Sequence, residues 1–286
     1  MKNILKYILA TGLLQQVAIG QTEADFQDSA TPFGYETIAP VMEAGSDEAS
    51  ATFQSEDLPV LLDFVNENLS EYQSLSDISA VSLDPEALLL QNESSVRVYF
   101  LAEGAGYRNT LGFTTEALSS GETSEALLIF PDASSSATFT NEAFVTDPDS
   151  LSDATRTDDT PLVSGDFVDL GIYDAGTFVD FFLISNGANG GSKLYTADAS
   201  TNPDLLQHVV AFAIPDSPYL LIGFEDLYNG GDKDYNDIVF AVDVGVLNVA
   251  YLANPEPAFW MMMAVLILAG VCSYRRRSGE MLSNLC

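Results

Sequence analysis

Short apolar runs with the length of β-strands recur through the middle of the chain. They are rich in β-branched and aromatic residues, and Gly, Pro, Asp and Ser separate them. The nine runs are residues 95–102, 110–115, 126–131, 165–171, 177–185, 193–196, 207–214, 218–224 and 237–244. No helical pattern lies between them, which argues against parallel βαβ units. The pattern predicts a mainly β fold over residues 93–247, an antiparallel β-sandwich with jelly-roll-like organisation.

A helical period precedes these runs. Apolar side chains recur there at steps of three and four residues: Leu58, Leu61, Leu62, Val65, Leu69 and Tyr72. Asp57 stands at the N-cap position and Pro59 in the first turn, where both residue types favour the start of a helix. A shorter helical turn is expected from Asp84. Residues 53–92 are therefore predicted to form a helical flank on the sandwich.

The beginning of the chain has the layout of an exported protein. Residues 1–20 carry two lysines, a short apolar run and a small-residue end, as secretory signal peptides do. Residues 21–52 hold Glu, Asp, Ser, Thr, Ala and Pro without a sustained period. Such a segment buries too little apolar surface to offset the entropy of ordering. We expect a signal peptide followed by a flexible acidic leader.

The net charge of the chain limits the partners that it can bind. The chain has 42 acidic and 10 basic residues, a formal net charge of −32 at pH 7. Between residues 22 and 254, forty acidic side chains face five basic ones, and both cysteines lie later, at Cys272 and Cys286. Such a surface repels nucleic acid and attracts divalent cations. We exclude nucleic acid as a partner and expect no disulfide in the exported part. Solubility alone accounts equally well for most of the acids.

The densest chemistry lies in a loop between two apolar runs, within residues 223–242. Asn229, Gly230 and Gly231 accept positive φ easily, so the chain can turn sharply there. Six oxygen-bearing side chains surround this turn: Glu225, Asp226, Asp232, Asp234, Asn236 and Asp237. Calcium takes about six to eight oxygen ligands, which favours a calcium site. An EF-hand is a poor match, because Asp237 stands where that loop needs glycine. The alternative is that these side chains only cap turns.

Catalytic signatures are weak. The one histidine, His208, opens a strand-like run, where we expect a structural role. The sequence has no G-x-S-x-G elbow, no H-E-x-x-H, no P-loop and no dinucleotide fingerprint. Carboxylate pairs carry no weight, since forty acids always contain pairs. We expect a protein that is not an enzyme.

Three segments resemble a known bacterial family. The run FEDLYNGGDKDYNDIVF is similar to the closing signature of domain of unknown function 4114. Residues 98–113 resemble its opening signature, and LGIYDAGTFVDFFLISNGAN resembles its central one. The resemblance covers residues 94–245 and implies a β-rich, secreted or surface-exposed module without an established activity. It also implies that residues 104–112 lie near the acidic loop, where Glu103 or Asn109 would complete the shell of the cation.

The end of the chain resembles a sorting signal. Pro255, Glu256 and Pro257 precede an apolar run, residues 258–274, and then Arg275, Arg276 and Arg277. This is similar to the PEP-CTERM signal of Gram-negative bacteria and implies processing by an exosortase. Seventeen residues are near the short limit for a transmembrane helix, and the arginines favour a cytoplasmic end. The tail after the arginines departs from the family pattern. A permanent C-terminal membrane anchor is the alternative.

Together, these features predict a non-catalytic protein of the cell surface or extracellular matrix. A calcium-stabilised β-sandwich would be exported, held in the inner membrane as a precursor and sorted by an exosortase. The alternative function is a carbohydrate-binding module that acts on extracellular polysaccharide. Aromatic side chains would then stack on sugar rings, and the candidates are Tyr107, Tyr173, Tyr195 and Tyr228.

Overall fold

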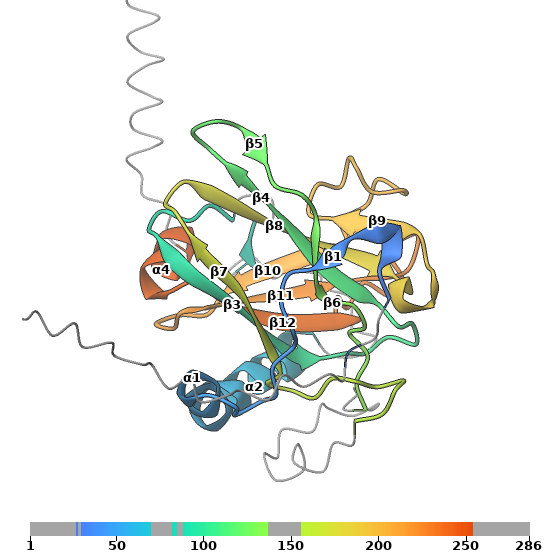
Figure 1. Ribbon diagram of the computed structural model, residues 1–286, viewed down its shortest axis with the longest axis horizontal. Coiled ribbons are helices and arrows are strands. Elements are labelled where there is room, and N and C mark those ends of the chain that lie inside the picture. Colours follow the sequence, from blue (N-terminus) through green and yellow to red (C-terminus); the bar gives the residue numbers. More distant parts are fainter. Residues whose placement is uncertain (1–26, 28–29, 70–81, 85–87, 137–155, 254–286) are drawn as a thin grey trace, which may run out of the picture.

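Two six-stranded sheets form the body of the protein (Figure 1). The computed structural model describes residues 27, 30–69, 82–84, 88–136 and 156–253. The first sheet has the order β1-β6-β4-β8-β9, with β5 beside β4. Its strands are β1 (Glu36–Thr37), β4 (Thr110–Ala117), β5 (Glu122–Thr123), β6 (Leu127–Phe130), β8 (Thr177–Ser185) and β9 (Lys193–Thr196).

The second sheet has the order β2-β10-β11-β12-β3-β7. Its strands are β2 (Ser82–Leu83), β3 (Ser94–Ala102), β7 (Phe167–Tyr173), β10 (Val209–Ala213), β11 (Tyr219–Phe224) and β12 (Ile238–Asp243). Pairing between the described strands is antiparallel except between β1 and β6. All nine expected strands are present, so the mainly β fold is confirmed.

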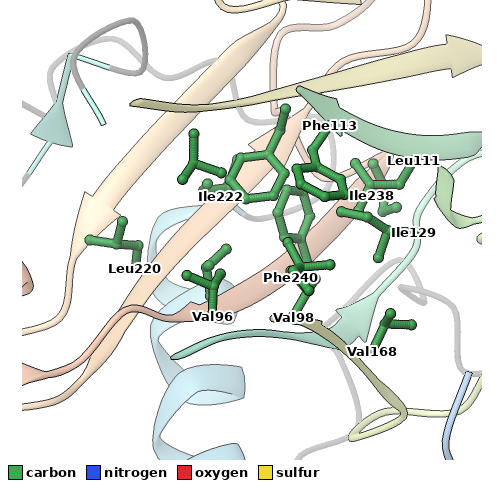
Figure 2. Packing of buried hydrophobic residues seen from close by; sticks show 14 of the residues in the cluster. Val96, Val98, Leu111, Phe113, Ile129, Val168, Leu220, Ile222, Ile238 and Phe240 are labelled. Carbon is green, nitrogen blue, oxygen red and sulfur yellow. The ribbon is translucent and has the colours of Figure 1, made fainter. Parts of the chain in front are cut away.

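The main core lies between the two sheets. Val96 and Val98 of β3 share one buried cluster with Leu111 and Phe113 of β4 (Figure 2). Phe100, the next alternate residue of β3, belongs to the same cluster. Successive residues of a strand point to opposite faces, so alternate apolar positions bury one face of each sheet. The two sheets therefore pack face to face, as in a sandwich.

The second sheet is buried on its other face too. The intervening positions of β3, Tyr99 and Leu101, pack in a separate cluster with Leu62 and Val65 of α2 (Leu58–Asn68). Phe53 stacks on Tyr99 with ring centroids 3.8 Å apart. Because both faces are covered, the strands of this sheet are apolar at almost every position. The predicted helical flank covers this face beside β3 and β12 (Figure 1).

The helix begins earlier than the sequence pattern indicated. A continuous helical segment runs through α1 (Glu48–Thr52), a π-helical turn η2 (Phe53–Asp57) and α2. Asp47 caps it: its side chain accepts a hydrogen bond from Ser50 N at 2.7 Å, and Ser50 Oγ accepts one from Asp47 N. The Asp57 side chain instead accepts a hydrogen bond from the Tyr219 hydroxyl at 3.0 Å. Asp57 does stand at the N-cap position of α2, with Pro59 in the first turn, but its side chain makes no capping hydrogen bond.

Part of the expected flexible leader is ordered against the sandwich. Glu36 of β1 pairs with Leu127 of β6, and Val41 is buried in the main core. Met42 exchanges backbone hydrogen bonds with Phe167. The local composition is polar, but contacts with distant strands supply the burial that the leader lacks by itself. This corrects the leader prediction for residues 36–52.

Two further elements differ from the expectation. Leu89 forms an antiparallel bridge with Phe178, so the described residues 88–90 continue a strand edge where a helical turn was expected. A short helix, α4 (Val246–Ala253), follows β12 and was not predicted. Within the described part of the chain, no helix is long and apolar enough to cross a membrane. The predicted signal peptide, residues 1–20, and the sorting signal, residues 254–277, lie outside the described residues.

Candidate metal site

The acidic loop and the segment after β3 meet at one end of the second sheet. β12 pairs with β3, which brings the end of β3 to the start of β12. Gly104 N donates a hydrogen bond to Asn236 O at 2.9 Å, and a side chain at Gly104 would collide with Asn236. The two segments are neighbours, as expected. They enclose a cavity of about 360 Å³.

All six predicted site residues line this cavity. The complete lining is Gly104, Ala105, Gly106, Tyr107, Glu225, Asp226, Leu227, Asp232, Asp234, Asn236 and Asp237. Their oxygens fall into two groups, Glu225 with Asp226 and Asp237, and Glu225 with Asp232 and Asp234. Within each group, one oxygen per side chain lies within 4.8 Å of the others. Glu225 belongs to both groups, so the two groups share this side chain.

The loop reaches this arrangement through a series of left-handed backbone conformations. Asn229, Gly230, Gly231, Lys233 and Tyr235 all have positive φ. At Gly231 a Cβ atom would overlap the carboxylate of Glu225, so the close approach requires glycine. Lys233 N donates to the same carboxylate at 3.0 Å. The backbone thus wraps around Glu225 and holds its oxygens toward the other acids.

Burial and neighbouring charges raise the pKa values of several carboxyl groups in the site. Glu225 and Asp226 are 1% and 2% exposed. Burial, followed by the charges of Asp226 and Glu225, raises the pKa of Asp237 to about 10. Burial also raises the pKa of Asp226 to about 6 and that of Glu225 in the same direction. None of the ion pairs between described residues includes these three side chains. Burial and neighbouring charges therefore favour the protonated forms of these carboxylates, and a bound cation would favour the ionised forms.

Asn109 plays a different part from the one expected. Its amide Nδ2 donates to Asp226 Oδ2 at 2.6 Å, while its Oδ1 accepts from Asn186 N at 2.9 Å. The amide oxygen is therefore already engaged, and the nitrogen that faces the acids cannot bind a cation. Asn109 orients Asp226 and is not a ligand. This orientation corrects the expectation that it completes the shell.

Glu103 is also turned elsewhere. Its carboxylate is 3% exposed and accepts a hydrogen bond from Ser135 N at 3.2 Å. Burial raises the pKa of Glu103 to about 8. Glu103 is not among the residues that line the cavity. The Ser135 amide thus engages one oxygen of Glu103, and Asp226 is close enough for its charge to help raise the pKa of Glu103.

Two residues that the sequence reading did not assign to the site lie directly behind the loop. His208 is fully buried and contacts Asp204 and the backbone oxygen of Glu225. The only signal in the sequence was the i,i+4 spacing of an acid and a histidine just before a strand.

The aromatic residues predicted to stack on sugar rings differ in exposure. Tyr107 is exposed in the cavity wall, whereas Tyr195 is fully buried. Tyr173 is half-buried, and Tyr228 is exposed beneath the Lys193 ammonium.

Comparison with known proteins finds one family model that matches part of the chain. No curated protein and no solved structure matches the chain. The segment that resembles an opening signature, residues 98–113, lies outside the family match. Residues 173–245, which include β8 to β12 and the entire acidic loop, match the family described as Domain of unknown function (DUF4114).

Proposed function

We propose that this protein is an exported, non-catalytic surface module whose acidic loop binds calcium and is stabilised by it. The observation that carries the proposal is Glu225, a carboxylate 1% exposed whose oxygens belong to both groups of acids. The metal-binding side chains among the described lining residues are carboxylates and one amide, with no histidine or cysteine among them. This donor set suits calcium better than zinc or copper. Magnesium is less suited, because it demands a near-ideal octahedron.

Thermal melting of the purified protein tests the calcium site. At calcium one hundredfold above its dissociation constant, binding adds about 2.7 kcal/mol to the free energy of unfolding. The melting temperature should therefore rise when chelator is replaced by millimolar calcium. The double variant Asp232→Ala with Asp234→Ala should lose this rise. An unchanged melting temperature of the unmodified protein would reject the proposal.

A matched control separates site loss from general charge removal. Asp63 and Glu67 are exposed on α2, away from the cavity lining. The double variant Asp63→Ala with Glu67→Ala removes the same charge as the loop variant. It should keep the full calcium effect. Equal loss in both double variants would indicate a diffuse charge effect.

A second candidate function is calcium-dependent carbohydrate binding. Tyr107 and Leu227, 42% and 44% exposed, lie in the wall of the cavity that holds the acids. A cavity of about 360 Å³ is larger than one ion requires, and its size is in the range of ligand pockets. Sugar hydroxyls would complete the calcium shell while a ring face packs on Tyr107. Binding of neutral polysaccharide with calcium, and its loss in Tyr107→Ala, would favour this function.

Export and sorting complete the proposal. The signal peptide, residues 1–20, and the segment with Pro255, Glu256, Pro257 and three arginines support passage through the inner membrane and processing by an exosortase. The acidic, cysteine-free region between them is consistent with an outside location. The jelly-roll-like strand order remains a prediction.

A further inference from the structure

The His208 ring is held at both of its nitrogens. Nδ1 lies 2.8 Å from the backbone oxygen of Glu225, and Nε2 lies 3.0 and 3.1 Å from the two carboxylate oxygens of Asp204. A carbonyl oxygen only accepts, so Nδ1 carries a hydrogen and donates a hydrogen bond to Glu225 O. His208 therefore fixes the backbone of the residue whose side chain both groups of acids share.

Asp204 holds the other limb of the loop. Its Oδ2 accepts a hydrogen bond from Asn229 N at 2.7 Å. Asn229 is the first of the residues with positive φ that shape the turn around Glu225. The Asp204 and His208 pair thus connects Glu225, at the start of the loop, with Asn229, at its turn.

The surroundings make this connection rigid. The Tyr195 ring, from β9 of the first sheet, stacks on His208 with centroids 3.8 Å apart. Asn202 fastens the segment that carries Asp204: its Oδ1 accepts from Thr196 N, and its Nδ2 donates to Thr196 O and Leu206 O. Residues of both sheets therefore hold the pair in place.

We propose that Asp204 and His208 form a positioning clamp that sets the acidic loop in its ligating geometry. Neither side chain lines the cavity, so both act through Glu225 and Asn229. The inference rests on the proposed calcium site. Outer partners of metal ligands typically contribute about 10–100-fold to metal affinity, because they fix the orientation of the ligands. The clamp should contribute on this scale.

Two pairs of variants test the clamp. In His208→Asn, the amide nitrogen occupies the place of Nδ1 and keeps the bond to Glu225 O. In His208→Gln, the amide nitrogen occupies the place of Nε2, and the hydrogen bond to Glu225 O is lost. Both variants lose the stacking on Tyr195 equally. Likewise, Asp204→Asn keeps an oxygen for Asn229 N, whereas Asp204→Ala does not.

Calcium titration calorimetry on the whole protein gives the first readout. His208→Gln and Asp204→Ala should weaken calcium binding about 10–100-fold, while His208→Asn and Asp204→Asn stay within a few-fold of the unmodified protein. Val168→Ala, a core variant on β7 at the opposite edge of the sheet from β10, controls for lost stability. It should leave the calcium affinity unchanged. Equal weakening within each pair, or none, would overturn the clamp.

Amide hydrogen exchange in chelator gives a second readout that needs no calcium. The backbone amide of Asn229 should exchange faster in Asp204→Ala than in Asp204→Asn. The backbone amides of the loop should exchange faster in His208→Gln than in His208→Asn. If the unmodified protein binds no calcium, the proposed function fails, but this readout still decides whether the clamp orders the loop. Unchanged exchange in all four variants would reject it.

Discussion

At Gly231 the backbone has a φ of +37°, and the place of a Cβ atom is taken by the Glu225 carboxylate. Its neighbour Gly230 also has positive φ, yet a Cβ there would meet only the flexible side chains of Lys233 and Leu206, the nearest atom at 3.5 Å. The two glycines therefore serve different purposes. Gly230 permits the turn, and Gly231 permits the turn and the close approach of a ligand.

Alanine at each glycine separates these roles. Both Gly230→Ala and Gly231→Ala should lose about 1–2 kcal/mol of stability from left-handed strain. Only Gly231→Ala should also weaken calcium binding, by about tenfold or more, because the methyl group displaces Glu225. Calorimetry and urea unfolding measure the two effects. Equal calcium affinities in the two variants would contradict the role given to Gly231.

The acids of the site make metal-free stability depend on pH. Burial and neighbouring charges raise the pKa of Asp237 from 3.8 to about 10 in the folded protein. The folded state holds this proton more tightly than the unfolded state. The resulting stability is present below the unfolded pKa and is lost as pH rises through the folded pKa. Asp226, with a pKa of about 6, adds to the loss at the acidic end of this range.

We therefore expect calcium-free protein to lose stability between pH 4 and pH 10 more steeply than Asp237→Asn does. The amide keeps the shape of the side chain but has no titratable proton. Urea unfolding at several pH values in metal-free buffer measures the difference. In the proposed site calcium would replace the proton, so the stabilising effect of calcium should grow with pH in the unmodified protein. Parallel pH profiles for the two proteins would contradict this assignment.

At the scale of elements, the second sheet depends on the helix that covers it. Leu62 of α2 is fully buried in the cluster on the outer face of the sheet, whereas Val60, two residues earlier, is 60% exposed. An antiparallel sheet can leave one face in water. Here Tyr99, Leu101 and Val239 make that face apolar, so the helix is needed to bury it.

Leu62→Ala should lower the free energy of unfolding by about 2–5 kcal/mol, because it leaves a cavity beneath the helix. Val60→Ala, on the exposed side, should change it by less than about 0.5 kcal/mol. Urea unfolding of both variants gives the comparison. Calcium affinity should stay unchanged in both, since neither residue lines the site. Similar stability losses would show that α2 does not cover the sheet as described.

At the scale of the whole molecule, the distribution of charged residues along the chain bears on the predicted sorting. The region between residues 22 and 254 carries forty acids against five bases, while the basic residues outside it cluster near both ends of the sequence. Basic residues stay on the cytoplasmic side of a membrane, and moving three arginines through hydrocarbon is costly. Both ends thus favour an orientation with the acidic body outside.

Mass spectrometry of protein released from the cell surface tests the sorting prediction. Processing by an exosortase should leave a C-terminus near residues 254–257. Replacing Pro255 and Pro257 with alanine should prevent this cut and keep the protein in the membrane fraction, with the basic cluster unchanged as a control. Released or anchored protein that extends to Cys286 would instead support a permanent anchor.

Local patterns were sufficient for the strands and for the acids of the site. Alternation of apolar side chains follows directly from burial of one strand face, so nine strands could be predicted. The two-residue strands β1, β2 and β5 are too short to show any period. The residues that line the cavity with oxygen atoms were also predictable, because all six lie within thirteen residues of one glycine-containing loop.

Tertiary structure alone decided the features that join distant residues. Nothing local in Val41 or Asp47 indicates that this polar stretch packs on the sandwich. Asn109 and Asp226 are 117 positions apart, and only the pairing of β12 with β3 and the packing of the two sheets bring them together. The sequence by itself determined which residues bring oxygen atoms to the loop, since composition and period are local properties. Which side chains line the cavity and which only support them depended on side-chain direction, and packing between sheets sets that direction.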